Sequence, residues 1–595
     1  MSGTIQMSIN GITVTARPGQ TILEAATEAG IQIPTLCHHP ALKPIGACRV
    51  CLVEVKGQRT LQPACTFPVS DKLEVQTESP KVVEARRFVL ELLFSERNHF
   101  CMFCEMSGDC ELQSLGYRYG LDHWMYPTYT KRFPVDATRD YFLMDHNRCV
   151  LCRRCVRACS ELVANHTLDL RQRGAHSMIS SDLNVPFGDS SCVSCGTCLQ
   201  VCPTGALVDK RSAYMARDKD TVHTKSTCSQ CSLGCGIDIV TRGGLLLRIQ
   251  GDWQGAVNGG VVCARGRFEP LYETRTRIAT PLLRDEGDLR EVSWSIALHE
   301  AARRLRDAAP KKLGVLVSSR LTNEALYLLA ALFRDGLKAR TAGLLEKVAP
   351  PISAKAQGSL ADIEKSDCLL LVGADPAADQ PVASFLIKRS VDKGARLIVV
   401  GDETHGLSAF ATTLVPPAGL ASALERVQRA DYPVVVYGAG IDEKARAALK
   451  KLDSRARFVA LQPGVNTRAA VAFGFEQTLK VSGLDVLLVA AGEQDMDGQA
   501  VIEKIPDATY LIVLASYHSG LTEKADVVLP VATWPERSGS LTSTDGLVLK
   551  AHKAVDPAGE AKADWEVVSL IAEKLDRKAG ASLEEISAEA LRTLA

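Results

Sequence analysis

The pattern of apolar and polar residues changes about halfway along the chain. Near the N-terminus the two kinds alternate over 6–10 and 12–15, which predicts two strands. The segment Thr21–Glu24 then has the form of a capping box for a short helix that Gly30 would end. Apolar residues at helical spacing predict a second helix over 80–98. We therefore expect the N-terminal part to mix strands and helices.

From about residue 280 onwards, short continuous apolar runs alternate with helical stretches rich in Ala, Lys and Arg. Runs of this kind between helices are typical of parallel strands covered by helices on both faces. The six clearest runs are Leu313–Ser318, Cys368–Gly373, Arg396–Gly401, Val434–Gly438, Val486–Ala491 and Tyr510–Ala515. We expect this half, roughly 315 residues, to form an α/β region with more than one sub-domain.

The composition argues against several classes of function. Lys plus Arg and Asp plus Glu both number 69, so no net charge attracts nucleic acid or an anionic membrane. Aromatic residues make up only 5%, which also argues against a surface for stacking bases. The segment Met1–Asn10 lacks the pattern of a signal peptide, and no apolar stretch reaches the ~18 residues of a membrane span. We expect a cytoplasmic protein that reaches a membrane, if at all, through its partners.

The cysteines carry the main chemical signal. Nineteen of the 20 lie in the first 263 residues, in spaced groups that are typical of iron–sulfur ligands rather than of a disulfide framework. The first group is Cys37, Cys48, Cys51 and Cys65. Four thiolates with a tight central pair suit a [2Fe–2S] cluster, although they would also satisfy tetrahedral zinc. The preceding strand, turn, strand and helix are in the order of a β-grasp ferredoxin, which favours iron.

The second group contains His99, Cys101, Cys104 and Cys110. Three cysteines are one ligand short for a [4Fe–4S] cluster, and a neutral imidazole could supply the fourth. The alternative is that His99 is an ordinary polar side chain and the site is incomplete. The position of His99, two residues before a run of three cysteines, favours a ligand.

An internal repeat supplies the third and fourth groups. The run Cys149–Cys159 recurs 43 residues later as Cys192–Cys202. In such C-x2-C-x2-C-x3-C runs the fourth cysteine binds the other cluster. The two expected ligand sets for [4Fe–4S] clusters are therefore Cys149, Cys152, Cys155, Cys202 and Cys192, Cys195, Cys198, Cys159. Two clusters held so close together suit electron exchange better than a purely structural role.

The fifth group, another [4Fe–4S] set, is Cys228, Cys231, Cys235 and Cys263. Nineteen cysteines and one histidine then supply ligands for one [2Fe–2S] and four [4Fe–4S] clusters. The remaining Cys368 lies in an apolar run and is expected to be a buried, inert thiol. We expect no flavin, NAD or molybdenum site. The strand before Gly438 and Gly440 has Glu443 where a dinucleotide fingerprint needs its third glycine.

Taken in order, these groups resemble the large iron–sulfur subunit of respiratory complex I, the G-subunit family of NADH–quinone oxidoreductase, over essentially the whole chain. The segments Gly108–Gln113 and Cys202–Leu207 are similar to phrases of that family. The resemblance implies a multidomain α+β and α/β fold. Its parts would be an N-terminal β-grasp [2Fe–2S] ferredoxin, a one-His/three-Cys [4Fe–4S] domain, a two-cluster bacterial-type ferredoxin domain, a [4Fe–4S] domain of the molybdopterin-oxidoreductase type and a molybdopterin-oxidoreductase-like α/β domain. The implied boundaries are 1–80, 81–120, 139–218, 221–277 and 278–595.

The resemblance also implies a function in electron transfer. The chain would relay electrons within a multisubunit NADH dehydrogenase, from an NADH-oxidising FMN flavoprotein and a small [2Fe–2S] subunit to a downstream acceptor subunit. That acceptor would be either a subunit of the quinone module or the small subunit of a [NiFe] hydrogenase. The chain itself would be an oxidoreductase subunit without catalytic residues.

Two departures from the family pattern leave other complexes open. The spacing His99-x-Cys101 is shorter than the family's usual H-x3-C and resembles the diaphorase iron–sulfur subunit of NAD(P)-linked or electron-bifurcating [NiFe] hydrogenases. The α/β half resembles NAD-linked formate dehydrogenases, a third possibility. It lacks a cysteine in the region expected to bind molybdenum, and Arg265 stands where catalytic relatives generally carry Lys. We expect this half to have lost its catalytic metal.

Overall fold

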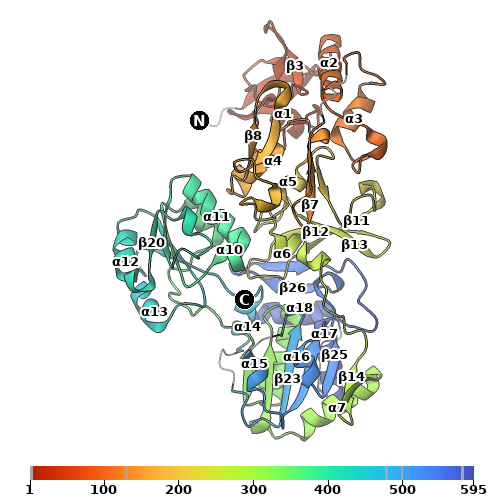
Figure 1. Ribbon diagram of the computed structural model, residues 1–595. Helices are drawn as coiled ribbons and strands as arrows, with labels where there is room; N and C mark the ends of the chain where they lie inside the picture. The colour runs from red at the N-terminus through yellow and green to blue at the C-terminus, as the bar shows by residue number, and fades with distance from the viewer. Residues whose placement is uncertain are drawn as a thin grey trace. The chain divides into compact units, whose positions relative to one another are not determined.

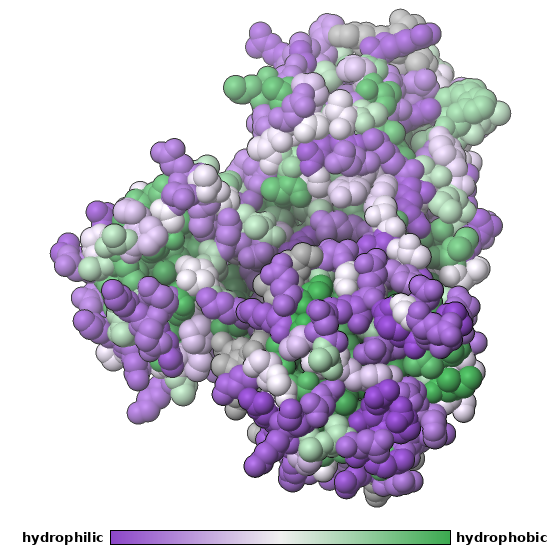
Figure 2. All heavy atoms as spheres, turned by 60° about the horizontal axis from the view of Figure 1, so that its bottom comes forward, coloured by the Kyte–Doolittle hydropathy of each residue, from purple (hydrophilic) through white to green (hydrophobic). Residues whose placement is uncertain are grey.

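The computed structural model describes residues 4–127, 132–475, 480–497, 500–577, 580 and 582–594. The chain divides into two compact units, Met1–Thr221 and Val222–Ala595, and each is described by itself (Figure 1). Among the described residues, no helix is long and apolar enough to cross a membrane. On the face drawn in Figure 2, hydrophilic side chains predominate and hydrophobic ones form small groups.

The first unit begins with a five-stranded sheet of order β2-β1-β5-β3-β4. Strand β1 pairs antiparallel with β2 and parallel with β5. The predicted capping box is present, because the Glu24 amide donates to Thr21 Oγ1 over 3.2 Å and the Thr21 amide donates to Glu24 Oε2 over 2.7 Å. Gly30 ends the helix region with a φ of +74°, as its sequence position predicts. The elements are β1 (Ile5–Ile9), β2 (Ile12–Ala16), α1 (Ile22–Glu28), β3 (Leu52–Val55), β4 (Gln62–Pro63) and β5 (Glu74–Gln76).

Helix α2 (Pro80–Glu96) follows and packs against both the sheet and helix α3 (Glu111–Arg118). Its fully buried Arg86 donates to the Leu52 carbonyl and to the Tyr119 hydroxyl, each over 2.7 Å. Helix α2 ends two residues before the predicted position 98, because Arg97 is extended and directs its guanidinium to the His146 carbonyl.

The remainder of the first unit is built from short elements. A three-stranded sheet of order β10-β7-β6 and the hairpin β8–β9 lie beside the helices α4 and α5. The region holds more buried apolar side chains than its sequence suggested, including Phe142, Leu168, Ile179 and Phe187. The elements are β6 (Val135–Asp136), β7 (Phe142–Asp145), α4 (Arg154–Arg157), β8 (Leu168–Arg171), β9 (Met178–Ser181), α5 (Thr197–Gln200) and β10 (Leu207–Asp209).

The sequence repeat is reproduced in the backbone of the cysteine runs. Leu151 and Ser194, at matching positions, both have a φ of +52°, and the next matching pair, Arg153 and Gly196, have φ values of +60° and +69°. Each pair of left-handed residues leads directly into a one-turn helix, α4 or α5. Equal cysteine spacing therefore goes with equal loop geometry.

The second unit opens with a three-stranded antiparallel sheet of order β11-β12-β13 and then forms two larger sheets. The seven-stranded sheet has the order β15-β14-β25-β24-β23-β16-β17, and its five central and edge strands from β25 to β17 run parallel. The strands are β11 (Val222–Thr227), β12 (Gly236–Arg242), β13 (Leu245–Gly251), β14 (Leu282–Asp285), β15 (Asp288–Glu291), β16 (Leu313–Val317), β17 (Thr341–Leu344), β23 (Val486–Gly492), β24 (Tyr510–Ala515) and β25 (Val527–Pro530).

The five-stranded sheet, of order β20-β19-β18-β21-β22, is wholly parallel and is inserted between β17 and β23. Each of the two sheets has its own buried apolar cluster, and helices such as α11 and α12 lie beside the smaller sheet (Figure 1). The predicted multidomain α+β and α/β fold class is thus confirmed. The strands are β18 (Cys368–Val372), β19 (Arg396–Val400), β20 (Thr413–Val415), β21 (Pro433–Tyr437) and β22 (Arg457–Ala460), with the hairpin β26 (Gly539–Thr542) and β27 (Val548–Ala551).

The helices of the second unit cover these sheets. They are α6 (Ala264–Arg267), α7 (Trp294–Asp307), α8 (Asn323–Leu329), α9 (Leu360–Lys365), α10 (Pro376–Asp379), α11 (Pro381–Asp392), α12 (Leu420–Gln428), α13 (Glu443–Lys450), α14 (Thr467–Ala472), α15 (Ala500–Lys504), α16 (Gly520–Lys524), α17 (Asp564–Lys574) and α18 (Leu583–Leu594).

Candidate metal centres

The four thiols of the first group meet as two close pairs beside the N-terminal sheet. Cys51 Sγ and Cys65 Sγ are 3.4 Å apart, and the Cys37 amide donates to Cys48 Sγ over 3.3 Å. The hydrogen bond between the Cys37 and Cys48 side chains lowers the pKa of Cys37 and raises that of Cys48. Two pairs of thiols fit a [2Fe–2S] cluster, because each of its two irons binds two thiolates.

His99, Cys101, Cys104 and Cys110 line one small cavity. His99 Nε2 is buried and has no hydrogen-bond partner among the described residues. Burial, followed by the charges of Arg148 and Arg97, lowers the pKa of His99 to about 4, so the imidazole is neutral at pH 7. A neutral imidazole with one free nitrogen facing three thiols fits a metal ligand.

Close packing at this second group depends on one glycine. A Cβ on Gly205 would lie 2.6 Å from Cys104 Sγ, closer than a carbon and a sulfur can approach. A side chain at this position would therefore displace a candidate ligand. Burial raises the pKa of Cys110 to about 12, so a bound cation would have to favour the thiolate form.

The repeat brings together the crossed ligand sets that its spacing predicts. Cys149, Cys152, Cys155 and Cys202 line a single cavity, with Cys202 coming from the second run. Burial raises the pKa of Cys198 well above its ordinary value, and the neighbouring thiols of Cys195, Cys192 and Cys159 raise it further. Cys159 of the first run therefore lies with the second set.

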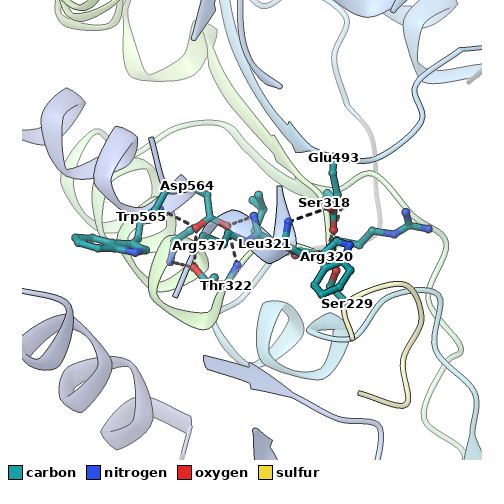
Figure 3. Close-up of polar contacts among 12 residues, drawn as sticks. Ser229, Ser318, Arg320, Leu321, Thr322, Glu493, Arg537, Asp564 and Trp565 are labelled. Atoms are coloured by element: carbon teal, nitrogen blue, oxygen red, sulfur yellow. Dashed lines mark hydrogen bonds and ion pairs between the residues drawn. The ribbon is translucent and has the colours of Figure 1, made fainter. Parts of the chain in front are cut away.

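In the second unit, Cys228, Cys231, Cys235 and Cys263 are all buried. Burial raises the pKa of Cys263 to about 12, with Cys231 contributing next. The cysteine loop is tied to the seven-stranded sheet where β23 ends, because Ser229 Oγ donates to Glu493 Oε1 over 2.7 Å (Figure 3). The Trp534 amide donates to the other oxygen of the same carboxylate over 3.2 Å.

The spacing of these thiols is that of clusters rather than of single ions. Nowhere in the described chain do three His, Cys, Asp or Glu side chains converge closely enough to hold one metal ion. Each cysteine of a [4Fe–4S] cluster binds a different iron, so its four sulfurs stand further apart than those around one zinc ion, where about 2.3 Å separates each sulfur from the metal. This favours the iron–sulfur interpretation over the zinc alternative.

The α/β half does not supply the cysteine that a catalytic molybdenum site would use. Cys368 is fully buried within β18 and opens onto no cavity. A pocket lies at the carboxyl ends of β18 and β21, where Gly373, Gly438 and Gly440 line it. Arg265 also lines this pocket and donates to the Asp379 carbonyl over 3.1 Å.

Sequence analysis missed the buried arginines that surround the cysteines of the first unit. Their guanidinium groups donate to backbone carbonyls beside or on candidate ligands, such as Arg139 to Cys192 O over 2.9 Å. Three arginines within the run Cys149–Cys159 were the available signal, but spacing alone does not say which of them are buried. The arginines are Arg97, Arg139, Arg148, Arg154 and Arg157.

Comparison with family models gives matches along most of the chain. The model described as molybdopterin oxidoreductase matches residues 277–574, and that for the molybdopterin oxidoreductase Fe4S4 domain matches 221–272. A 2Fe-2S iron-sulfur cluster binding domain matches 2–80. The NADH-ubiquinone oxidoreductase-G iron-sulfur binding region matches 86–124, and the ferredoxin-like domain of NADH-quinone oxidoreductase subunit 3 matches 140–208.

Individual proteins are similar over nearly the whole chain. The G subunit, type 2, of NADH-quinone oxidoreductase from Rhizobium meliloti is 28% identical over 99% of this chain and 82% of its own length. NADH-quinone oxidoreductase subunit 3 of Thermus thermophilus is 29% identical over 96% of this chain and 83% of its own. Among solved structures, a chain of an NAD+-reducing [NiFe]-hydrogenase in the H2-reduced state is 35% identical, covering 36% of this chain and 91% of that one, with a TM-score of 0.34.

Proposed function

The chain belongs to the molybdopterin oxidoreductase family and is similar to the G subunits of NADH–quinone oxidoreductases, and on this basis we propose that it is the electron-relay subunit of a complex I-like NADH dehydrogenase. Iron–sulfur clusters, when bound, take up and release single electrons. The observation that carries the proposal is the assembly of five four-ligand groups in the order in which the chain presents them.

The proposed ligands follow the groups described above. Cys37, Cys48, Cys51 and Cys65 would hold a [2Fe–2S] cluster. His99 would complete the group of Cys101, Cys104 and Cys110. The three remaining [4Fe–4S] sets are Cys149, Cys152, Cys155, Cys202; Cys192, Cys195, Cys198, Cys159; and Cys228, Cys231, Cys235, Cys263. Buried surroundings and hydrogen bonds near the sulfurs would adjust each reduction potential.

Partner subunits would supply the chemistry at both ends of the relay. The proposed partners are an NADH-oxidising FMN flavoprotein, a small [2Fe–2S] subunit and a downstream acceptor subunit. The His99 group supports contact with a partner, because its cysteines are incompletely buried and its loop exposes Phe100, Met102 and Phe103, the last two to 80% and 67%. Exposed apolar side chains over a redox site are typical of a surface that another subunit covers.

A second candidate is the diaphorase side of a [NiFe] hydrogenase, which the short spacing between His99 and Cys101 favours. Metal analysis of the native complex, purified through a tag on this chain, separates the candidates. We expect about 18 iron atoms per chain in addition to those of the partners, without nickel. Stoichiometric nickel would establish the hydrogenase alternative. Molybdenum or tungsten would indicate a molybdoenzyme of the formate dehydrogenase type.

The ligand role of His99 has its own test. We expect His99→Ala to remove or shift one [4Fe–4S] signal in electron paramagnetic resonance (EPR) spectra of the reduced complex, because the orphaned Nε2 would be lost. His99→Cys should restore four ligands and keep a cluster with a lower reduction potential. His123→Ala is the control, since that imidazole is exposed and pairs with Asp122. Unchanged spectra in His99→Ala would refute the assignment.

A further inference from the structure

Helix α4 (Arg154–Arg157) lies among three of the proposed cluster sites in the first unit. It carries Cys155 itself, and its two terminal arginines are 4% and 5% exposed. The two guanidinium groups reach different sites, and they differ in what balances their charge.

Arg154 is neutralised by a carboxylate. Its Nη1 and Nη2 donate to the two oxygens of Glu111 over 2.6 and 2.7 Å, a bidentate pair. Glu111 follows Cys110, and its amide donates to the Pro203 carbonyl over 2.9 Å, next to Cys202. Arg154 therefore connects the His99 group to the first ferredoxin set, while its charge is compensated on the spot.

Arg157 reaches the [2Fe–2S] group instead, and its partners are carbonyls. It donates to Cys37 O and Lys43 O, and its Nε is buried without a partner among the described residues. The nearby carboxylate of Glu161 accepts from the Lys43 amide over 2.9 Å. No ion pair of Arg157 occurs in the part of the chain that the structure describes.

The surroundings of Arg157 contain further groups that avoid positive charge. Burial, followed by the charges of Arg154 and Arg157, lowers the pKa of His38. Burial, again with Arg154 as the next cause, lowers the pKa of His39 to about 4. A buried guanidinium among neutral imidazoles needs a negative partner, since an isolated charge in a protein interior is strongly disfavoured. Four thiolates around two irons would provide one.

We propose that Arg157 is a positioning residue for the [2Fe–2S] site, whose negative charge it balances and whose reduction potential it raises. This inference rests on the proposed function, because it requires a cluster at Cys37, Cys48, Cys51 and Cys65. One electron from the partner flavoprotein makes the site one unit more negative, and a fixed positive charge favours that reduced form. The two hydrogen bonds to the 37–43 loop also hold the site against the helix that carries Cys155.

The test is a redox titration of the native complex, followed by the EPR signal of the reduced [2Fe–2S] cluster. We expect Arg157→Met to lower the reduced-to-oxidised ratio roughly tenfold at a fixed potential, which corresponds to about 59 mV for one electron. Arg157→Lys keeps the charge and should stay close to the wild-type ratio. Arg153→Met removes the same charge from an exposed position one turn away and should leave the ratio unchanged.

Three outcomes would overturn the proposal. They are an unshifted titration in Arg157→Met with full iron content, an equal shift in Arg153→Met, and a shift in Arg157→Lys as large as that in Arg157→Met. If Arg157→Met fails to retain the cluster, Arg157→Lys decides alone: a ratio close to wild type supports the role of the charge, and a tenfold loss rejects it. Absence of any [2Fe–2S] signal from the wild-type complex would instead refute the proposed function, and so the two failures are distinguishable.

Discussion

The two units of this chain form their interiors from different materials. In the second unit the buried clusters consist almost entirely of aliphatic side chains from parallel strands and the helices that cover them. In the first unit, one buried cluster combines Leu36, Val50, Leu90 and Leu112 with the candidate ligands Cys37 and Cys152. The comparison indicates that folding of the first unit is coupled to its metal, whereas the second unit's sheets have an apolar core that does not require it.

Iron removal should separate the two units most strongly. We expect chelation under reducing conditions to abolish amide protection over residues 99–218, because buried thiols without metal lose the interactions that organise these short elements. Protection of β16, β23 and β24 should persist. Hydrogen exchange followed by mass spectrometry measures both regions in one experiment. Unchanged protection over 99–218 would mean that the polypeptide alone specifies that region.

A cavity in the larger sheet should have the opposite selectivity. Leu488 is fully buried within β23, so Leu488→Ala should lower the free energy of unfolding of the second unit by about 2–5 kcal/mol. Iron content and the EPR signals of the first unit should remain as in the wild type. Urea unfolding followed by amide exchange in β24 gives the loss. Leu547→Ala, at a side chain 44% exposed, is the control and should change stability by less than about 0.5 kcal/mol.

The smallest effect is expected on the surface of the N-terminal sheet. Lys56 Nζ and Glu74 Oε1 are 2.7 Å apart, but both side chains are more than half exposed. Because solvent screens such a pair, Lys56→Ala should cost about 0.2–1 kcal/mol and leave the [2Fe–2S] signal unchanged. Exchange of amides in β3 and β5 is the measurement. A loss above about 2 kcal/mol would show that this sheet depends on surface charge more than the comparison allows.

Local patterns predicted much of the fold correctly. The apolar runs of the second half locate β18, β19, β21 and β24 to within one residue at either end, because a strand buried on both faces must be apolar throughout. The capping box at Thr21 was predictable for a similar reason, since both of its hydrogen bonds join residues three apart. The end of helix α2 was not, because Arg97 leaves the helix to reach a carbonyl 49 residues away.

The sequence by itself determined which side chains are candidate ligands, because cluster ligands follow one another at short, regular spacings that any folded loop must respect. It also determined that a histidine had to complete the second group if that group is to have four ligands. Only the tertiary structure decided what surrounds these groups. The pairing of Arg154 with Glu111 and the approach of Arg157 to Cys37 join segments 43 and 120 residues apart. No local pattern encodes such contacts, since they depend on how helix α4 packs against loops that are distant in the chain.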